Sequence, residues 1–287
     1  MPTDAGLSFD LASDYRQLTQ FPFMVHALEA GAIVAVMAAV VGWFMVVRRQ
    51  TFAGHTLSLV AFPGASAAVL AGLPLAAGYY AACAAGAAVL GGASGGGPRS
   101  HASESATIGT LQAVALGLGF LFVSLSHSVL GGLDALLFGT FLGITANQVL
   151  TLLLVAAGAL ALVALAGRPL LFASIDQELA RARGVPVRAL GLGFLLLLGL
   201  AVAATAQITG ALLVFALLVT PAATAFAITA RPLASLALAV AISLSVTWLG
   251  LAIAYFSPYP VGFCVTSLSF GLYVVTRAVA TALRRRR

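Results

Sequence analysis

The chain has 287 residues, of which 61% are hydrophobic and only 8% are charged, and its net charge is +6. A soluble domain is about 45–50% apolar and about 25% charged, so this composition excludes an ordinary soluble protein. Every basic residue is an arginine, and the arginines are spread over loops and the C-terminus rather than clustered in one basic patch. We therefore expect no nucleic-acid partner.

Nine apolar segments follow one another along the chain, most of them about as long as the hydrocarbon core of a bilayer requires. They predict an all-α, polytopic transmembrane helical bundle of about eight or nine spans in the lipid bilayer. The first 22 residues are polar and predict a flexible N-terminal tail, 23–283 form one transmembrane domain, and 284–287 form a basic tail. The segments are 24–47, 56–72, 76–92, 106–126, 149–167, 190–206, 210–229, 233–255 and 261–281.

The segment 126–148 between the fourth and fifth spans is less uniformly apolar and contains Asp134 and several glycines. It predicts a short interfacial or partly re-entrant helix with turns. The segment 91–105 is rich in Gly and Ser, which is typical of a flexible connector.

The arginines set the orientation, because cytoplasmic loops of membrane proteins carry an excess of Lys and Arg. If the N-terminus is outside and the chain crosses nine times, all arginines except Arg16 fall on the cytoplasmic side. The sequence thus predicts a multi-pass protein of the plasma membrane with a cytoplasmic C-terminus.

The stretch SIDQELARARGVPVR, residues 174–188, concentrates charge between two apolar spans. Ser174 and Gln177 have the spacing of a capping box, and Asp176 and Glu178 fall in the first turns, where the helix dipole favours acids. About nine helical residues extend roughly 13 Å, so this helix is too short to cross the bilayer.

The end of the same stretch has a stop signal. Arg181 and Arg183 match the negative end of the dipole, Gly184 permits a left-handed residue, and Pro186 prevents continuation. Two interpretations stay open: a solvated linker helix on the lipid headgroups, or a helix that docks in a groove of a partner.

This segment resembles the cytoplasmic coupling segment of the permeases of metal-ion-uptake ABC transporters, the zinc, manganese and iron importers. Arg183 stands where that family usually has Leu. The resemblance implies that the helix seats in a cleft of a separate ATPase subunit. The matching residues are Asp176, Glu178, Leu179, Ala180, Arg181, Ala182, Gly184 and Pro186.

The likeness to these permeases extends over nearly the whole chain from about residue 24. It implies a permease domain that forms a homodimer, receives cargo from an extracellular solute-binding protein, and binds no cofactor of its own. The chain has no GxxxxGK[ST] motif, so we expect ATP hydrolysis in the partner and no enzymatic activity here. The similar motifs are FMVVRRQTFAGHTLS (44–58), Pro63–Gly64, SESATIGT (103–110), LLFGTFLGI (136–144), QITGALLVFALLVTPAATA (207–225) and SPYPVG (257–262).

Candidate ligands for a transported metal are few. Ionisable residues inside a membrane are costly and are functional candidates, and His26, Glu29 and His55 are the main ones. His26 and Glu29 are three residues apart and so lie on one helix face. They are either a functional pair inside the membrane or polar residues at its outer interface. The family carries Asp-x-x-x-His where this chain has His55 and Leu59, so either His55 contacts a metal or it is a polar residue near the membrane boundary.

Other candidates follow from the same resemblance. Glu104 matches an acid of the family's pattern, but this chain has Ser105 where the pattern has its next acid. Pro221 lies inside an apolar span and predicts a kink, whose role is either packing or gating. Gln207, at the outer start of that region, and the Pro63–Gly64 pair belong to the same gating or kink group.

The predicted function is the permease subunit of a binding-protein-dependent ABC importer of divalent metal ions. One alternative cargo is a metal chelate such as a siderophore or cobalamin, which suits the loss of the second ligand at Leu59. A second alternative is an ATP-independent membrane carrier. An intramembrane enzyme is disfavoured, because the sequence has no HExxH motif and no pair of Asp residues inside the apolar spans.

Overall fold

A computed structural model describes residues 20–93, 101–126, 133–139, 143–211 and 213–285. The predicted tail 1–22 lies outside this part except for its last three residues, and so do residues 94–100 of the connector 91–105 and the last two residues of the basic tail 284–287. The described chain is helical and contains no strand.

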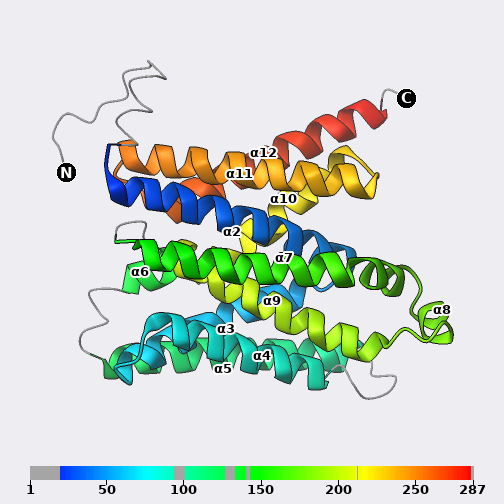
Figure 1. Cartoon of the computed structure of the whole chain (residues 1–287), viewed down its shortest axis with the longest axis horizontal. Coiled ribbons are helices and arrows are strands. Elements are labelled where there is room, and N and C mark those ends of the chain that lie inside the picture. The colour runs from blue at the N-terminus through cyan, green and yellow to red at the C-terminus, as the bar shows by residue number, and fades with distance from the viewer. Residues whose placement is uncertain (1–19, 94–100, 127–132, 140–142, 212, 286–287) are drawn as a thin grey trace.

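Figure 1 shows the long helices running side by side along one axis, with the two termini at opposite ends. The helices are α2 (Pro22–Val47), α3 (Thr51–Leu70), α4 (Leu75–Ala93), α5 (His101–Leu125), α6 (Leu133–Phe138), α7 (Ala146–Ile175), α8 (Gln177–Ala182), α9 (Val187–Thr209), α10 (Val214–Ile228), α11 (Pro232–Phe256) and α12 (Val261–Arg285).

Eight of the described helices are long and apolar enough to cross a membrane, which confirms the predicted helical bundle. The seventh predicted span, 210–229, is shorter than expected, because α10 has only 15 residues. Gly210 adopts a positive φ of 75° and ends α9, so the chain turns before α10 begins. A helix of 15 residues extends about 22 Å, less than the roughly 30 Å hydrocarbon core.

Helix α2 forms the centre of the bundle and contacts α7, α9, α10 and α11. It is hydrophobic on every side, as expected of a helix surrounded by other helices, and Met24, Met37 and Met45 on it are fully buried. Gly42 allows α10 to approach closely, since a Cβ atom there would overlap the carbonyl of Leu218. Small residues at such crossings are the usual means of packing helices in membranes.

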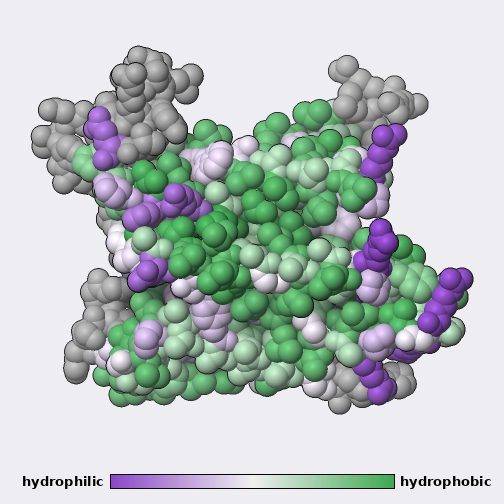
Figure 2. Space-filling model, viewed as in Figure 1, coloured by the Kyte–Doolittle hydropathy of each residue, from purple (hydrophilic) through white to green (hydrophobic). Residues whose placement is uncertain are grey.

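The hydropathy of the surface changes along the same axis as the helices. Figure 2 shows hydrophobic residues across the middle of the molecule and hydrophilic residues at the two ends, as a bilayer would require. The predicted short helix between α5 and α7 is present as the six-residue α6, and the amide of Ala211 donates to the carbonyl of Leu136 in it.

Candidate functional site

The charged segment begins at an aspartate cap. The Asp176 carboxylate accepts a hydrogen bond from the Leu179 amide at 2.9 Å, and the Asp176 backbone is extended, with φ −144° and ψ 102°. The predicted cap at Ser174 is wrong, because α7 continues through Pro169 to Ile175 and the Ser174 hydroxyl donates to the Leu170 carbonyl. The helix α8 is therefore six residues long rather than about nine.

The segment ends at Gly184, as predicted from the sequence. Gly184 has φ 79°, its amide donates to the Arg181 carbonyl at 3.0 Å, and the Val185 amide donates to the Ala180 carbonyl at 3.0 Å. These two bonds form a Schellman motif, which satisfies carbonyls that the helix end would leave unpaired. Pro186 follows as the N-cap residue of α9.

The outer face of α8 is exposed and mixed in character. Ala180 is fully buried, whereas Leu179 is 45% exposed and Ile175, just before the helix, is 83% exposed. Glu178 and Arg181 are exposed as well, and neither forms an ion pair within the described residues. Figure 1 shows α8 beyond the ends of the long helices. Exposed apolar side chains beside unpaired charges of both signs are what a protein-docking surface requires.

His55 is half-buried in the fifth position of α3, and the contacts of the next two residues show which parts of the bundle lie beside it. The neighbouring Thr56 hydroxyl accepts a hydrogen bond from Gln112, at the middle of α5, at 3.0 Å. The Leu57 carbonyl accepts from the thiol of Cys83, at the middle of α4, at 3.7 Å. The second span therefore begins at Thr51, and the residues next to His55 contact the middle of α4 and α5.

The His55 imidazole borders a cavity and has an unpaired nitrogen. Its Nδ1 atom is buried and has no hydrogen-bond partner, and its ring lies 4.9 Å from the ring of Phe215 on α10. The cavity beside it has a volume of about 260 Å³ and is also lined by Thr51 and Phe52. An unpaired nitrogen at the edge of a cavity can accept a proton or donate a lone pair to a cation.

The remaining ligand candidates do not join His55. His26 Nδ1 lies 3.1 Å from the Ile144 carbonyl near the start of α7, and Glu29 on α2 is exposed. Glu104 is on α5, but its side chain lies outside the described part of the structure. Among the described residues, no group of three or more His, Cys, Asp or Glu side chains could hold a metal ion. Within the described part of one protomer, His55 is thus the only one of these candidates beside the cavity.

The four predicted gating or kink residues lie within helices α3, α9 and α10. Pro221 is buried inside α10, where it removes one backbone hydrogen bond. Pro63 is buried inside α3, and a Cβ atom on Gly64 would overlap the backbone of Gly78 on α4. The Gln207 amide donates to the Ala203 carbonyl one turn earlier, at 3.3 Å.

Two arginines have contacts that sequence reasoning missed. The Arg48 guanidinium lies 5.1 Å from the centre of the Phe194 ring and so ties the end of α2 to α9. The Arg277 guanidinium donates to the Tyr273 hydroxyl at 2.6 Å. The four-residue spacing of Tyr273 and Arg277 is a visible signal, whereas the Arg48 contact joins distant segments and leaves no local pattern.

Comparison with known proteins gives consistent findings. The profile of the ABC 3 transport family matches residues 20–280. The manganese transport system membrane protein MntC of Halalkalibacterium halodurans is 30% identical over 217 residues, or 76% of this chain and 73% of that protein. A probable iron transport system membrane protein of Haemophilus influenzae is 27% identical over 262 residues, or 90% of this chain and 94% of that protein.

Two solved structures share the fold. One is PsaBC from Streptococcus pneumoniae in complex with Fab, with a TM-score of 0.81 and 28% identity, covering 92% of this chain and 94% of that chain. The other is a metal-chelate type ABC transporter in an inward-facing conformation, with a TM-score of 0.74, 16% identity, and coverage of 95% of this chain and 91% of that chain. At that identity the second comparison shows the fold alone.

Proposed function

The chain belongs to the ABC 3 transport family, and from this membership we propose that it is the permease of a binding-protein-dependent importer that moves divalent metal ions across the plasma membrane. A separate ATPase subunit supplies the energy, and an extracellular solute-binding protein delivers the cargo. The observation that carries the proposal is α8, a capped helix outside the bundle with exposed apolar and charged side chains.

Helix α8 is built to transmit movement. It is joined to α7 through Asp176 and to α9 through the turn at Gly184, so a displacement of α8 acts on both long helices. Helix α9 in turn contacts α2, α3 and α4. ATP-driven movement of the partner against α8 therefore reaches the helix that carries His55.

The charge distribution supports an orientation with α8 in the cytoplasm. Arg48 follows α2, Arg168 lies in the last third of α7 and Arg231 follows α10, and these three helices run toward the end of the molecule where α8 and the end of α12 lie. The positive-inside rule assigns that end to the cytoplasm. The N-terminus is then outside.

A second copy of the permease completes the passage. The best 18-residue windows of α5 and α12 are each only 17% buried, against 67% for α2. Phe120 on α5 and Phe270 on α12 are 53% and 64% exposed. These faces are available to lipid and to a partner protomer, and a symmetric dimer with His55 facing its axis would bring two imidazoles together.

The cargo is manganese, iron or zinc. Imidazole is a good ligand for zinc and iron and a weaker one for manganese. The relatives named for manganese and iron transport support this choice. A metal chelate is the second candidate, because Leu59 is 8% exposed and apolar where the family carries a second ligand. A chelate brings its own ligands and does not need a second one from the protein.

Reconstitution tests the proposal. The permease is placed in proteoliposomes with candidate ATPases and binding proteins, and uptake of Mn²⁺, Fe²⁺ and Zn²⁺ is measured beside uptake of a ferric chelate. ATP-dependent uptake of a bare ion is expected. Uptake of the chelate alone would replace the cargo, and uptake without any ATPase would show an ATP-independent carrier.

A further inference from the structure

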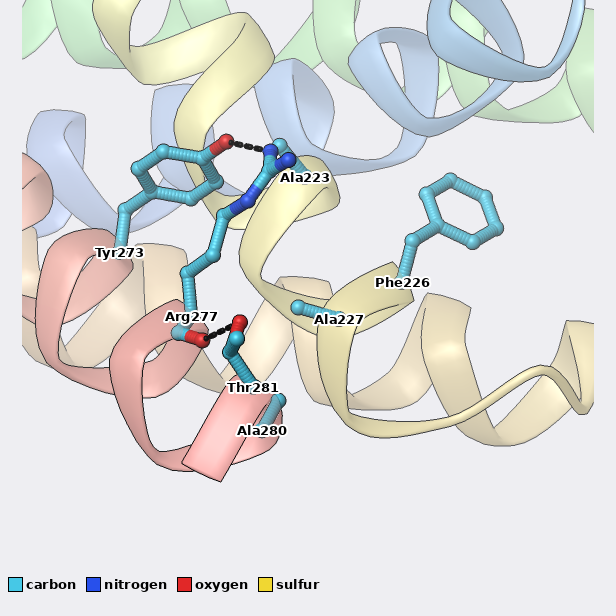
Figure 3. A pocket seen from close by; sticks show the side chains of 7 residues that line it. All are labelled: Ala223, Phe226, Ala227, Tyr273, Arg277, Ala280 and Thr281. Atoms are coloured by element: carbon cyan, nitrogen blue, oxygen red, sulfur yellow. Dashed lines mark hydrogen bonds between the residues drawn. The ribbon is translucent and has the colours of Figure 1, made fainter. Parts of the chain in front are cut away.

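A polar pocket between α10 and α12 is separate from the His55 cavity. Its volume is about 330 Å³, and Tyr273, Arg277 and Thr281 of α12 face Ala223 and Ala227 of α10 across it (Figure 3). The three alanines of the lining leave space between the two helices. No acidic side chain is among the described residues that line it.

Arg277 is a charged residue inside a membrane-spanning segment. The apolar part of α12 extends from Val261 to Ala282, so Arg277 lies five residues before its end. Its side chain runs back along the helix to Tyr273 (Figure 3), toward the middle of the segment and away from the nearer end. A charged group within a membrane span is costly unless it has a polar partner, water or a counter-charge, and the Tyr273 hydroxyl is a neutral partner that leaves the positive charge of Arg277 uncompensated.

The hydrogen bonds of the pocket leave donors free. Arg277 has five N–H groups, and the hydrogen bond from Nη1 to the Tyr273 hydroxyl uses one of them. That hydroxyl accepts from Arg277, so its own hydrogen remains available. The Thr281 hydroxyl donates to the Arg277 carbonyl at 2.8 Å and thus fixes the helix rather than a ligand. The pocket therefore offers a planar cation and a phenol donor to an acceptor-only anion.

We propose that this pocket binds the phosphate of an anionic phospholipid headgroup in the cytoplasmic leaflet. Guanidinium and phosphate form paired, charge-assisted hydrogen bonds. Phe270 and Val274 lie on the same face of α12 as Arg277, toward the middle of the segment, and are 64% and 45% exposed. They give the acyl chains an apolar surface beside the headgroup, which a free phosphate ion would not use.

The charge of the surroundings favours the same ligand. Helix α12 continues to Arg285, and the chain ends in four consecutive arginines, 284–287. Basic clusters next to a membrane span attract anionic lipids by about 1 kcal/mol per residue near the surface. The leaflet follows from the proposed orientation, whereas the headgroup site itself does not depend on the cargo or on the ATPase.

Thermal stability in detergent tests the site with the full chain. Dioctanoyl phosphatidylglycerol, dioctanoyl phosphatidylcholine and inorganic phosphate are titrated separately, and the apparent Kd is taken from the shift in Tm. Phosphatidylglycerol should bind at least about tenfold more tightly than phosphatidylcholine, and R277Q should lose that preference, since bonds to a charged group are involved. R168Q removes an exposed arginine from α7 instead and should keep the preference.

Each other outcome decides against the site or its ligand. An unchanged preference in R277Q overturns the proposal, and so does equal binding of the two lipids. A shift with inorganic phosphate alone would identify a free anion instead of a lipid. Loss of dimerisation in R277Q without any lipid preference in the wild type would identify a carboxylate of the second copy. If R277Q does not fold, Y273F and lipid counting by native mass spectrometry give the same test.

Discussion

The cap of α8 can be removed without touching its outer surface. Asp176→Ala deletes the 2.9 Å hydrogen bond to the Leu179 amide, and loss of such a cap costs about 1 kcal/mol. Gly184→Ala leaves a residue with a side chain at φ 79°, which costs roughly 1–2 kcal/mol. A six-residue helix has few other bonds, so these costs apply to the helix itself.

Hydrogen exchange of the α8 amides measures the effect. The amides of Arg183, Gly184 and Val185 donate within the segment, so they report its opening. About 1 kcal/mol corresponds to roughly fivefold faster exchange in Asp176→Ala, and the double variant with Gly184→Ala should exchange at least about thirtyfold faster. Coupled ATP hydrolysis should fall in the same order.

Asp176→Asn is the matched control, because asparagine caps helices about as well as aspartate. It should exchange like the wild type. Exchange in Asp176→Ala that equals the wild type would refute the claim that this cap holds α8 in place.

Other predictions concern the docking face, the cavity and the bundle. Glu178→Arg and Arg181→Glu should each abolish co-purification with the ATPase while unfolding free energy changes by less than about 0.5 kcal/mol, because both side chains are exposed; survival of the complex in both would rule out the docking face. His55→Ala should lower uptake of the bare ion about tenfold, a loss of roughly 1.4 kcal/mol, whereas His26→Ala should leave uptake unchanged. Equal effects of the two histidine variants would contradict a role of the cavity. Gly64→Leu should destabilise the protein by about 1–3 kcal/mol in thermal unfolding, because its Cβ would overlap the backbone of α4; an unchanged Tm would show that the two helices can separate.

The sequence predicts helices better than it predicts their ends. Apolar runs mark where the chain can be in lipid, and they correctly located the bundle. They placed the end of the fifth span at residue 167, although α7 continues to Ile175, because a helix keeps its hydrogen bonds after its composition turns polar. Because α7 extends this far, Ser174 lies inside it, and Asp176 rather than Ser174 caps α8.

The surroundings of His55 could not be read from local pattern. The sequence places it before an apolar run, and only the bonds from Gln112 and Cys83 on other helices show which parts of the bundle lie beside it. The cavity likewise needs Phe215 from α10, which is far away along the chain. By contrast, the stop at Gly184 is encoded locally, since a left-handed residue after a short helix favours glycine.

Accessibility of α8 is the most direct test of the central claim that it meets the ATPase in the cytoplasm. Both native cysteines, Cys83 and Cys264, are buried, so Gln177→Cys can be labelled against a low background with a membrane-impermeant maleimide. Leu73→Cys, at the exposed turn between α3 and α4, is the matched control for the outer side. Intact cells should label Leu73→Cys only, and Gln177→Cys should react after permeabilisation and be protected by the bound ATPase. Labelling of Gln177→Cys in intact cells would contradict the account.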